Sequence, residues 1–217
     1  MMANLFSMFD PCTGMLSLNW MSTLIFMMIT PYSYWLVPNK INYIFNKLMM
    51  NLHFEMKMLM NYKGTSMIML SMFMFILFNN LMGLLPYVFT SSSHLVYSLA
   101  LALPIWFCLM IYGWINKYNS MFSHLVPTGT PGILMPFMVL IETVSNIIRP
   151  GSLSVRLAAN MIAGHLLMSL LGNNTQVSIL MVSTMVIYMV LMMFELAVAM
   201  IQSYVFMTLS TLYSGEI

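Results

Sequence analysis

Apolar residues dominate five stretches of the chain, and a sixth stretch carries them only at helical spacing. The first three apolar stretches cover residues 15–37, 67–90 and 95–115. Each holds the roughly 20 residues that a helix needs to cross the hydrocarbon core of a bilayer. The pattern therefore predicts three ordinary transmembrane helices.

The sixth stretch, residues 39–65, mixes charged and apolar residues. A helix of this composition buries its apolar face in the bilayer interface and keeps its charges in water. We predict an amphipathic helix on the membrane surface, and a solvated linker is the alternative. The apolar residues at helical spacing are Ile41, Ile44, Phe45, Leu48, Met49 and Leu52, and the charged residues are Lys40, Lys47, Glu55, Lys57 and Lys63.

The last two apolar stretches are much longer. Residues 133–172 and 177–213 hold 40 and 37 residues, which as single helices would be about 60 and 55 Å long. The hydrocarbon core of a bilayer is only about 30 Å thick. Each stretch is therefore either two spans or one helix that tilts beyond the usual range of about 0–40° from the membrane normal.

The positions of the basic residues favour the tilted helices. With the N-terminus outside, Lys40 to Lys63 and Lys117 lie on the inner side, whereas the two outer turns, SSSH and GNNTQ, lack Lys and Arg. This is the positive-inside pattern. Breaking the first long stretch at Pro150 would place Arg149 in an outer loop and spoil the pattern. We therefore predict an all-α polytopic membrane protein, a single membrane domain over residues 1–217, that ends in a hairpin of two long, strongly tilted helices, the first kinked at its proline.

The composition excludes an ordinary soluble domain. Of the 217 residues, 61% are hydrophobic and 6% are charged, whereas about a quarter are charged in soluble domains. The net charge of +2 is too small to suggest a nucleic-acid partner. Thirty methionines exceed what soft core packing requires, which suggests a genetic code that reads an extra AT-rich codon as Met, as in animal mitochondria.

Ionisable residues inside the first long helix are the main candidates for function. Glu142, Arg149 and Arg156 are each seven residues apart, which places them on one helix face. Asn160 follows one turn later. An ionisable side chain in the middle of a membrane costs at least about 2.5–3.5 kcal/mol, so a functional role is the default hypothesis.

The second long helix carries a matching polar face. Tyr188, Glu195 and Gln202 are again seven residues apart. His165, on the first helix, is nine residues from Arg156 and therefore about 180° around that helix. We expect the imidazole to lie in a different environment from the guanidinium.

Two interpretations of these groups remain open from spacing alone. Folding the hairpin about Asn174 places Arg156 within about a turn of Glu195, and Gln202 nearer Arg149. The acids and arginines then either pair to hold the two helices together or form a proton relay that contains a barrier. We favour the relay, because a structural clasp needs fewer kinds of polar group.

Several kinds of site are not expected. The sequence lacks the GxxxxGK[ST] pattern of a phosphate-binding loop, so we expect no nucleotide site. Cys12 and Cys108 lie far apart, and no Cys or His spacing suggests zinc, haem or copper. We therefore expect no cofactor and no metal.

Four stretches of the chain resemble the subunit a family of F-type ATP synthases, in its mitochondrially encoded animal form and most closely its arthropod form. They are NNLMGLLPYVFT, VPTGTP, IETVSNIIRPGSLSVRLAANMIAGHLL and ELAVAMIQSYVFMTLSTLY. The resemblance implies a stator subunit with two offset proton half-channels, facing a rotating c-ring of proteolipid subunits and accompanied by other stator subunits of the membrane sector. Such a subunit couples proton flow to ATP synthesis without itself catalysing the chemistry of ATP.

The resemblance also implies a location and roles for individual residues. The chain would lie in the mitochondrial inner membrane, with its N-terminus towards the intermembrane space and its C-terminus towards the matrix. Arg156 would be the indispensable arginine, Glu142 would belong to the matrix-side half-channel, and Arg149 and Tyr188 are further candidates. The intermembrane-side half-channel would contain His165, Glu195, Gln202 and Asn160.

Two other classes of protein compete with this interpretation. A stand-alone ion channel or secondary transporter would be supported by inverted internal repeats, and we find no internal repeat in the sequence. A purely structural membrane subunit of a respiratory complex would not need two facing polar stripes. Co-purification with a ring of proteolipid subunits would separate all three.

Overall fold

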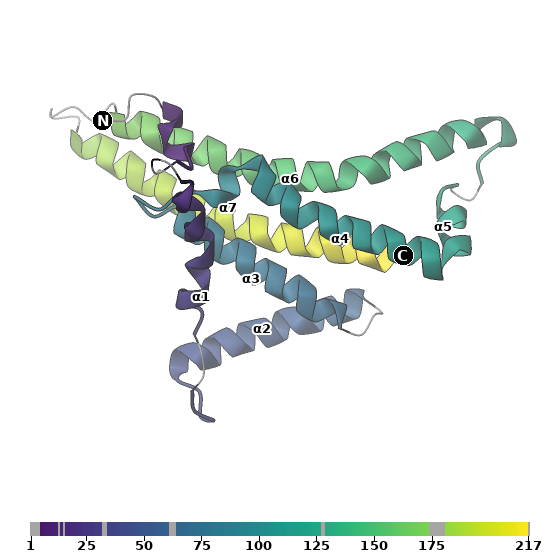
Figure 1. Cartoon of the computed structure of the whole chain (residues 1–217), viewed down its shortest axis with the longest axis horizontal. Helices are drawn as coiled ribbons and strands as arrows, with labels where there is room; N and C mark the ends of the chain where they lie inside the picture. Colours follow the sequence, from purple (N-terminus) through teal and green to yellow (C-terminus); the bar gives the residue numbers. More distant parts are fainter. Residues whose placement is uncertain are drawn as a thin grey trace.

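The computed structural model describes residues 5–12, 14, 16–31, 34–60, 64–126, 129–173 and 181–216, which fold into α-helices and short 3₁₀ helices (Figure 1). This confirms the predicted all-α fold class. In chain order the helices are η1 (Leu5–Phe9), η2 (Leu18–Leu24), α1 (Phe26–Ile29), α2 (Lys40–Leu59), α3 (Thr65–Gly83), η3 (Ser91–Ser93), α4 (Leu95–Asn116), α5 (Tyr118–His124), η4 (Gly132–Leu134), α6 (Met135–Asn173) and α7 (Met181–Glu216).

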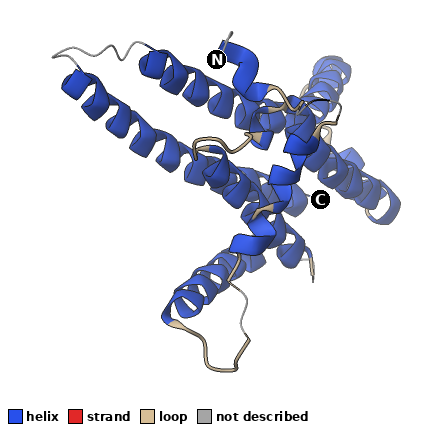
Figure 2. Ribbon diagram, turned by 60° about the vertical axis from the view of Figure 1, so that its left-hand side comes forward, coloured by secondary structure: helices blue, strands red, loops and turns tan. Residues whose placement is uncertain are grey.

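The two long helices form the body of the molecule together with α3 and α4. Helix α6 has 39 residues and α7 has 36, so they are about 58 and 54 Å long. Helix α3 packs mainly on α7, α4 packs on α6, and the long helices pack on each other. Figures 1 and 2 show this bundle from two sides, with α6 and α7 as its longest members.

Each long apolar stretch is one continuous helix over its described residues, not two spans. Helix α6 passes through Pro150 without ending, and Figure 1 shows that it is bent near its middle. Proline removes one backbone hydrogen bond and its ring clashes with the preceding turn, which accounts for such a bend.

The first apolar stretch differs from the helix expected over residues 15–37. The described helical part runs from Leu18 to Ile29, first as η2 and then as α1. Thr30 is extended, with φ −60° and ψ 127°, which is the conformation favoured by a residue before a proline, here Pro31. The helix is therefore shorter than the hydropathy pattern suggests, and the exposed residues Tyr34 to Val37 follow it.

The amphipathic stretch forms α2, which is shorter at its C-terminal end than the predicted range of 39–65. The helix packs on α3 and α7, and Met56 is fully buried there. Lys40, Lys47 and Lys57 remain exposed. Lys63, which the sequence places on the same side, lies outside the described residues, as do residues 174–180, which contain most of the predicted turn GNNTQ.

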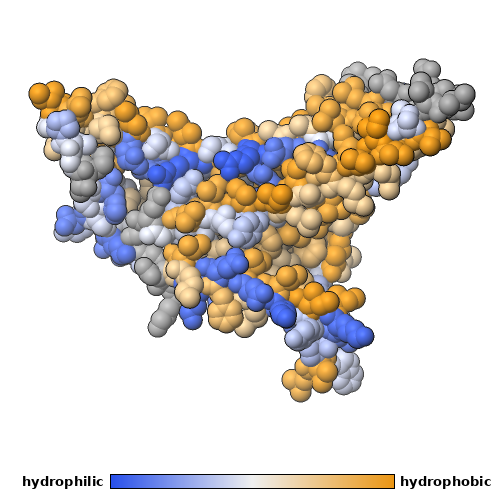
Figure 3. Space-filling view, turned by 180° about the vertical axis from the view of Figure 1, so that it is seen from behind, coloured by the Kyte–Doolittle hydropathy of each residue, from blue (hydrophilic) through white to orange (hydrophobic). Residues whose placement is uncertain are grey.

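The surface of the described helices is largely hydrophobic. Four of them, α3, α4, α6 with η4, and α7, are long and apolar enough to cross a membrane. The space-filling view in Figure 3 shows two rows of hydrophilic residues on this surface, one along α6 and one along α2. A surface with so few polar groups needs lipid around it.

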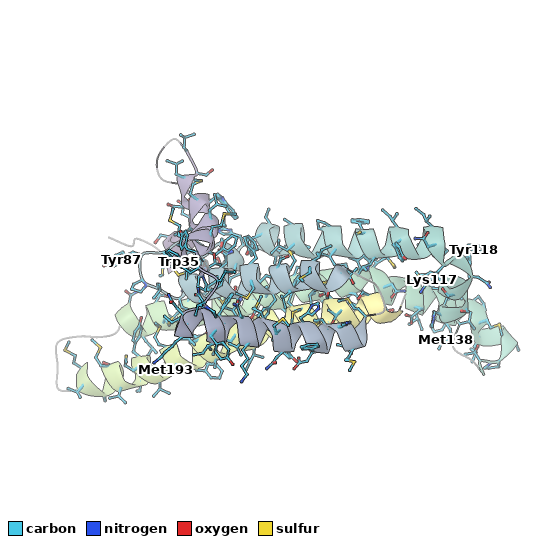
Figure 4. All side chains as sticks on the ribbon, turned by 90° about the horizontal axis from the view of Figure 1, so that it is seen from below. Trp35, Tyr87, Lys117, Tyr118, Met138 and Met193 are labelled. Carbon is cyan, nitrogen blue, oxygen red and sulfur yellow. The ribbon has the colours of Figure 1, made fainter. Side chains whose placement is uncertain are left out.

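The elements meet at two opposite ends of the bundle. Figure 4 places Lys117, Tyr118 and Met138 at one end, and Trp35 and Tyr87 at the other. The first group lies where α4 leads through α5 to the start of α6, and the second lies near the turns that follow α1 and α3. Helix α6 starts at the first of these ends, and its polar residues follow one another along its length from there.

Candidate functional site

Arg156 lies on the outer side of α6. Its side chain is exposed, whereas its neighbours Leu157 and Ala158 are buried against the bundle. Among the residues that the structure describes, the guanidinium has no ion-pair partner. The permanent positive charge of Arg156 therefore points away from the other helices of this chain.

A direct hydrogen bond joins the long helices one turn beyond the arginine. The amide Nδ2 of Asn160 donates to Oε1 of Gln202 at 3.0 Å, and Gln202 is buried. Both residues were predicted site residues on facing polar stripes, and the structure brings them into contact.

Glu195 and His165 are both buried, and Glu195 approaches α6 at the residue before His165. The carboxyl group of Glu195 lies directly against the Cα of Gly164, so closely that a Cβ atom at this position would collide with it. Glu195 and His165 are 5% and 6% exposed, and the imidazole Nε2 has no hydrogen-bond partner among the described residues. As the nine-residue spacing predicts, the imidazole is buried whereas Arg156 is exposed.

The predicted register of the hairpin is wrong by about three to four helical turns. Glu195 lies level with Gly164, eight residues and about 12 Å along the helix from Arg156, and Gln202 pairs with Asn160, not near Arg149. The two contacts centre the hairpin near residue 180. The prediction centred it on the polar letters NNTQ, but α6 ends at Asn173 and α7 begins at Met181, and Figures 2 and 4 show the helices apart at these ends.

Glu142 and Arg149 pair with each other along α6. The distance from Arg149 Nη2 to Glu142 Oε1 is 3.5 Å, and both side chains are partly exposed. Arg149 also lies 4.9 Å above the ring of Tyr213 near the end of α7. Since helical side chains lean towards the N-terminus, a seven-residue spacing lets the arginine reach back to the acid.

This ion pair lies at the wall of a cavity of about 660 Å³ between α4, α5, α6 and α7. The cavity is lined by polar residues of the first half of α6 together with aromatic and aliphatic side chains. A space of this volume can hold many water molecules. Its lining includes Trp106, Trp114, His124, Glu142, Asn146 and Arg149.

Tyr188 has a different environment from its partners on the polar stripe of α7. It is half-buried and packs on the apolar cluster of Leu84, Met168 and Ala199. The structure thus brings Gln202 to a hydrogen bond with α6 and Glu195 into close contact with α6, but gives Tyr188 apolar neighbours.

The turn between α3 and α4 holds polar residues that the sequence interpretation left out. The sequence presents SSSH as an outer polar turn, yet Ser91 to Ser93 are buried, and η3 packs on α6. Buried polar atoms of Asn80, Ser92 and His94 have no hydrogen-bond partner among the described residues. The pair of asparagines Asn79 and Asn80 inside an apolar span was the signal that could have identified this region.

Comparison with known proteins identifies the family. The model of the family described as ATP synthase A chain matches residues 3–215. Proteins named ATP synthase subunit a from Drosophila simulans, Locusta migratoria and Anopheles quadrimaculatus are 56%, 54% and 52% identical to this chain, and each alignment covers 100% of both sequences.

The chain therefore belongs to the ATP synthase A chain family, and the resemblance predicted from its motifs is confirmed. It is a membrane-embedded subunit of the membrane sector of an F-type ATP synthase, and its partners are other subunits of that complex. The relatives are insect proteins, which agrees with the arthropod-like sequence.

Proposed function

We propose that this chain is the stator subunit that forms two offset proton half-channels beside a rotating c-ring of proteolipid subunits. In this role it couples proton flow across the mitochondrial inner membrane to rotation, and so to ATP synthesis elsewhere in the complex. The N-terminus faces the intermembrane space and the C-terminus faces the matrix, as the distribution of lysines favours.

The exposed guanidinium of Arg156 is the observation that carries the proposal. A cation on the outer face of an apolar helix is unfavourable in lipid unless an anionic group accompanies it. The partner must therefore come from another chain, and a buried carboxylate on a neighbouring rotor subunit has the required charge. The nearby exposed residues Ala159 and Ala163 are small, which allows another helix to approach closely.

Two polar regions lie on either side of this arginine along α6. Glu142 and its cavity are 14 residues, about 21 Å, before Arg156, and His165 with Glu195 is about 14 Å beyond it. We assign the first region to the matrix-side half-channel and the second to the intermembrane-side half-channel. Asn160 and Gln202 belong to the second, and the unpartnered groups of Asn80, Ser92 and His94 extend it.

The chemistry of arginine explains why it separates the half-channels. A rotor carboxyl can face lipid only when it is protonated, because a bare charge there is too costly. Beside Arg156 the ionised form is favoured, so the proton leaves to one half-channel. Because a guanidinium does not deprotonate in proteins, it cannot pass the proton on to the other half-channel. Each proton that crosses releases about 2.3 kcal/mol per 100 mV of potential.

The lengths of α6 and α7 fit this role. Helices of about 58 and 54 Å remain within a hydrocarbon core of about 30 Å only if they tilt by roughly 60° from the membrane normal. Figure 1 shows η2 and α1 running across the direction of the long helices, as expected if the short apolar segment is aligned more nearly along the normal. A strongly tilted hairpin can follow the curved side of a ring.

The test is proton flux driven by a membrane potential in proteoliposomes that contain the assembled complex. With Arg156→Ala, we expect coupled pumping to vanish while the complex still assembles and passive leak through the membrane sector persists or appears. Val155→Ala, which changes the neighbouring exposed residue, is the matched control and should pump normally. Coupled pumping that continues in Arg156→Ala would refute the proposal.

A further inference from the structure

Two aromatic rings of the N-terminal segment lie on two imidazole groups, those of the buried His165 and the partly buried His94. Phe9 of η1 contacts His165 edge-on, with ring centroids 6.3 Å apart and an angle of 85° between the planes. The ring centroid of Trp20 of η2 lies 5.3 Å from that of His94, and Phe89 contacts both of these rings. The segment thus places one ring against each histidine, although the two histidines belong to different parts of the chain.

The two histidines share a second property. In both, Nε2 is buried and has no hydrogen-bond partner among the residues that the structure describes. A buried imidazole nitrogen without a partner is costly, because it has lost its hydrogen bonds to water. Phe9 and Trp20 are themselves half-buried, and an aromatic carbon surface offers these nitrogens no conventional hydrogen bond.

Polar contacts fix the segment in this position. The side-chain amide of Asn19 donates to the backbone oxygen of Asp10 at 3.3 Å, which ties η2 to the residue after Phe9. The hydroxyl of Ser22 donates to the backbone oxygen of Phe89 at 3.2 Å, which ties η2 to the turn between α3 and α4. Helix η1 also packs directly on α6.

We propose that Phe9 and Trp20 form an aromatic lid that limits the access of water to His165 and His94. Phe9 covers His165, which directly follows the glycine that the carboxyl group of Glu195 contacts. This inference rests on the proposed function in one respect: if His165 exchanges protons with water, Phe9 must move aside for the exchange to occur. The contacts that hold η1 are few and partly exposed, so local opening of this segment requires far less free energy than global unfolding.

The experiment measures how fast each histidine reacts with diethyl pyrocarbonate, a water-borne reagent that acylates neutral imidazole. The assembled complex in proteoliposomes is treated for increasing times, and the modified peptides are quantified by mass spectrometry. We expect Phe9→Ala to raise the initial rate at His165 by about tenfold or more and to leave His94 within about twofold of wild type. We expect Trp20→Ala to produce the reverse pattern.

Matched variants separate the lid from a general loosening of the segment. Phe6→Ala removes a ring from the same short helix, but this ring is 66% exposed and contacts neither histidine. It should leave both rates unchanged. Phe9→Leu keeps an apolar side chain in place and should raise the rate at His165 by no more than about threefold.

Unchanged rates in Phe9→Ala, or equal increases in Phe9→Ala and Phe6→Ala, would overturn the lid. The labelling rates report the cover over each imidazole whether or not His165 carries protons. A failure of the lid is therefore distinguishable from a failure of the proposed function, which the flux of Arg156→Ala tests separately.

Discussion

Each half of α6 contains an arginine, but the two arginines differ in their neighbours. In the first half, Glu142 and Arg149 pair with each other beside a cavity. In the second half, Arg156 is exposed without an ion-pair partner among the described residues, and His165 is buried with an unpartnered nitrogen. Both arginines follow an ionisable residue of α6 at the same spacing of seven residues.

The difference shows that the spacing of charged residues along one helix does not decide whether each of them has an ion-pair partner. Arg149 has an acid two turns towards the N-terminus, where its side chain points, and a tyrosine ring from α7 beneath it. Two turns before Arg156 there is only another arginine. The charges of the first half are paired within this chain, whereas Arg156 in the second half requires an anionic group from another molecule.

The largest expected effect comes from removing each arginine in turn. Arg156→Leu should lower coupled proton flux by at least about a hundredfold, because it removes the barrier and the counter-charge for the rotor. Arg149→Leu should lower it by less than about tenfold, because it breaks a partly exposed ion pair. Flux in proteoliposomes measures both. Equal losses in the two variants would mean that the halves of α6 do not differ in the way described.

A second comparison uses two glycines of α6. Gly164→Ala forces a Cβ into the carboxyl group of Glu195 and should lower the free energy of unfolding by about 1–3 kcal/mol. Gly151→Ala has open space around it and should raise that free energy by about 0.5–1 kcal/mol, since alanine favours helix. Unfolding of the subunit in a denaturing-detergent titration gives both values. If Gly164→Ala leaves the free energy of unfolding unchanged, Glu195 does not approach α6 as closely as described.

The hydrogen bond between the long helices should have a smaller effect. A double-mutant cycle of Asn160→Ala and Gln202→Ala should give a coupling free energy of about 0.6–1.7 kcal/mol. Tyr204→Phe removes an exposed hydrogen bond to Glu55 and should change the free energy of unfolding by less than about 0.5 kcal/mol. The same titration measures both, and a coupling of zero would show that the polar stripes do not meet at Asn160.

The smallest effect concerns the N-terminal segment. A hydrogen bond and the negative charge of Asp10 raise the pKa of the exposed Cys12 thiol. Asp10→Asn should therefore lower that pKa towards its ordinary value, leave more thiolate at a given pH, and speed maleimide labelling of Cys12 by about two- to threefold near pH 8. Cys108, which is free and exposed on α4, is the internal control. An unchanged ratio of the two labelling rates would rule out the influence of Asp10.

Much of the fold could be predicted, because hydropathy and proline positions act locally. The long helices α6 and α7 are expected from uninterrupted apolar stretches and from the absence of lysines in the outer turns. The shortened first helix was missed, since an extended conformation at Thr30 depends on Pro31, and hydropathy does not register this effect.

The candidate site was predicted as a set of residues but not as a set of contacts. Polar stripes were expected on both long helices, and the hydrogen bond joins Asn160 of one helix to Gln202 of the other, whereas the prediction placed Gln202 nearer Arg149. The register failed because it depends on where the helices converge, which local pattern does not specify. The contact of Phe9 with His165 joins residues distant in sequence, and no periodicity could indicate it.

The position of Phe9 against His165 also sets an order of events during biosynthesis. The imidazole partner of Phe9 is translated 156 residues after the ring. At about 5–20 residues per second, this interval lasts roughly 8–30 s. During that time Phe9 lacks its contact with His165, whereas Trp20 already has His94 available. The contact is therefore formed late, only after α6 has been synthesised as far as His165.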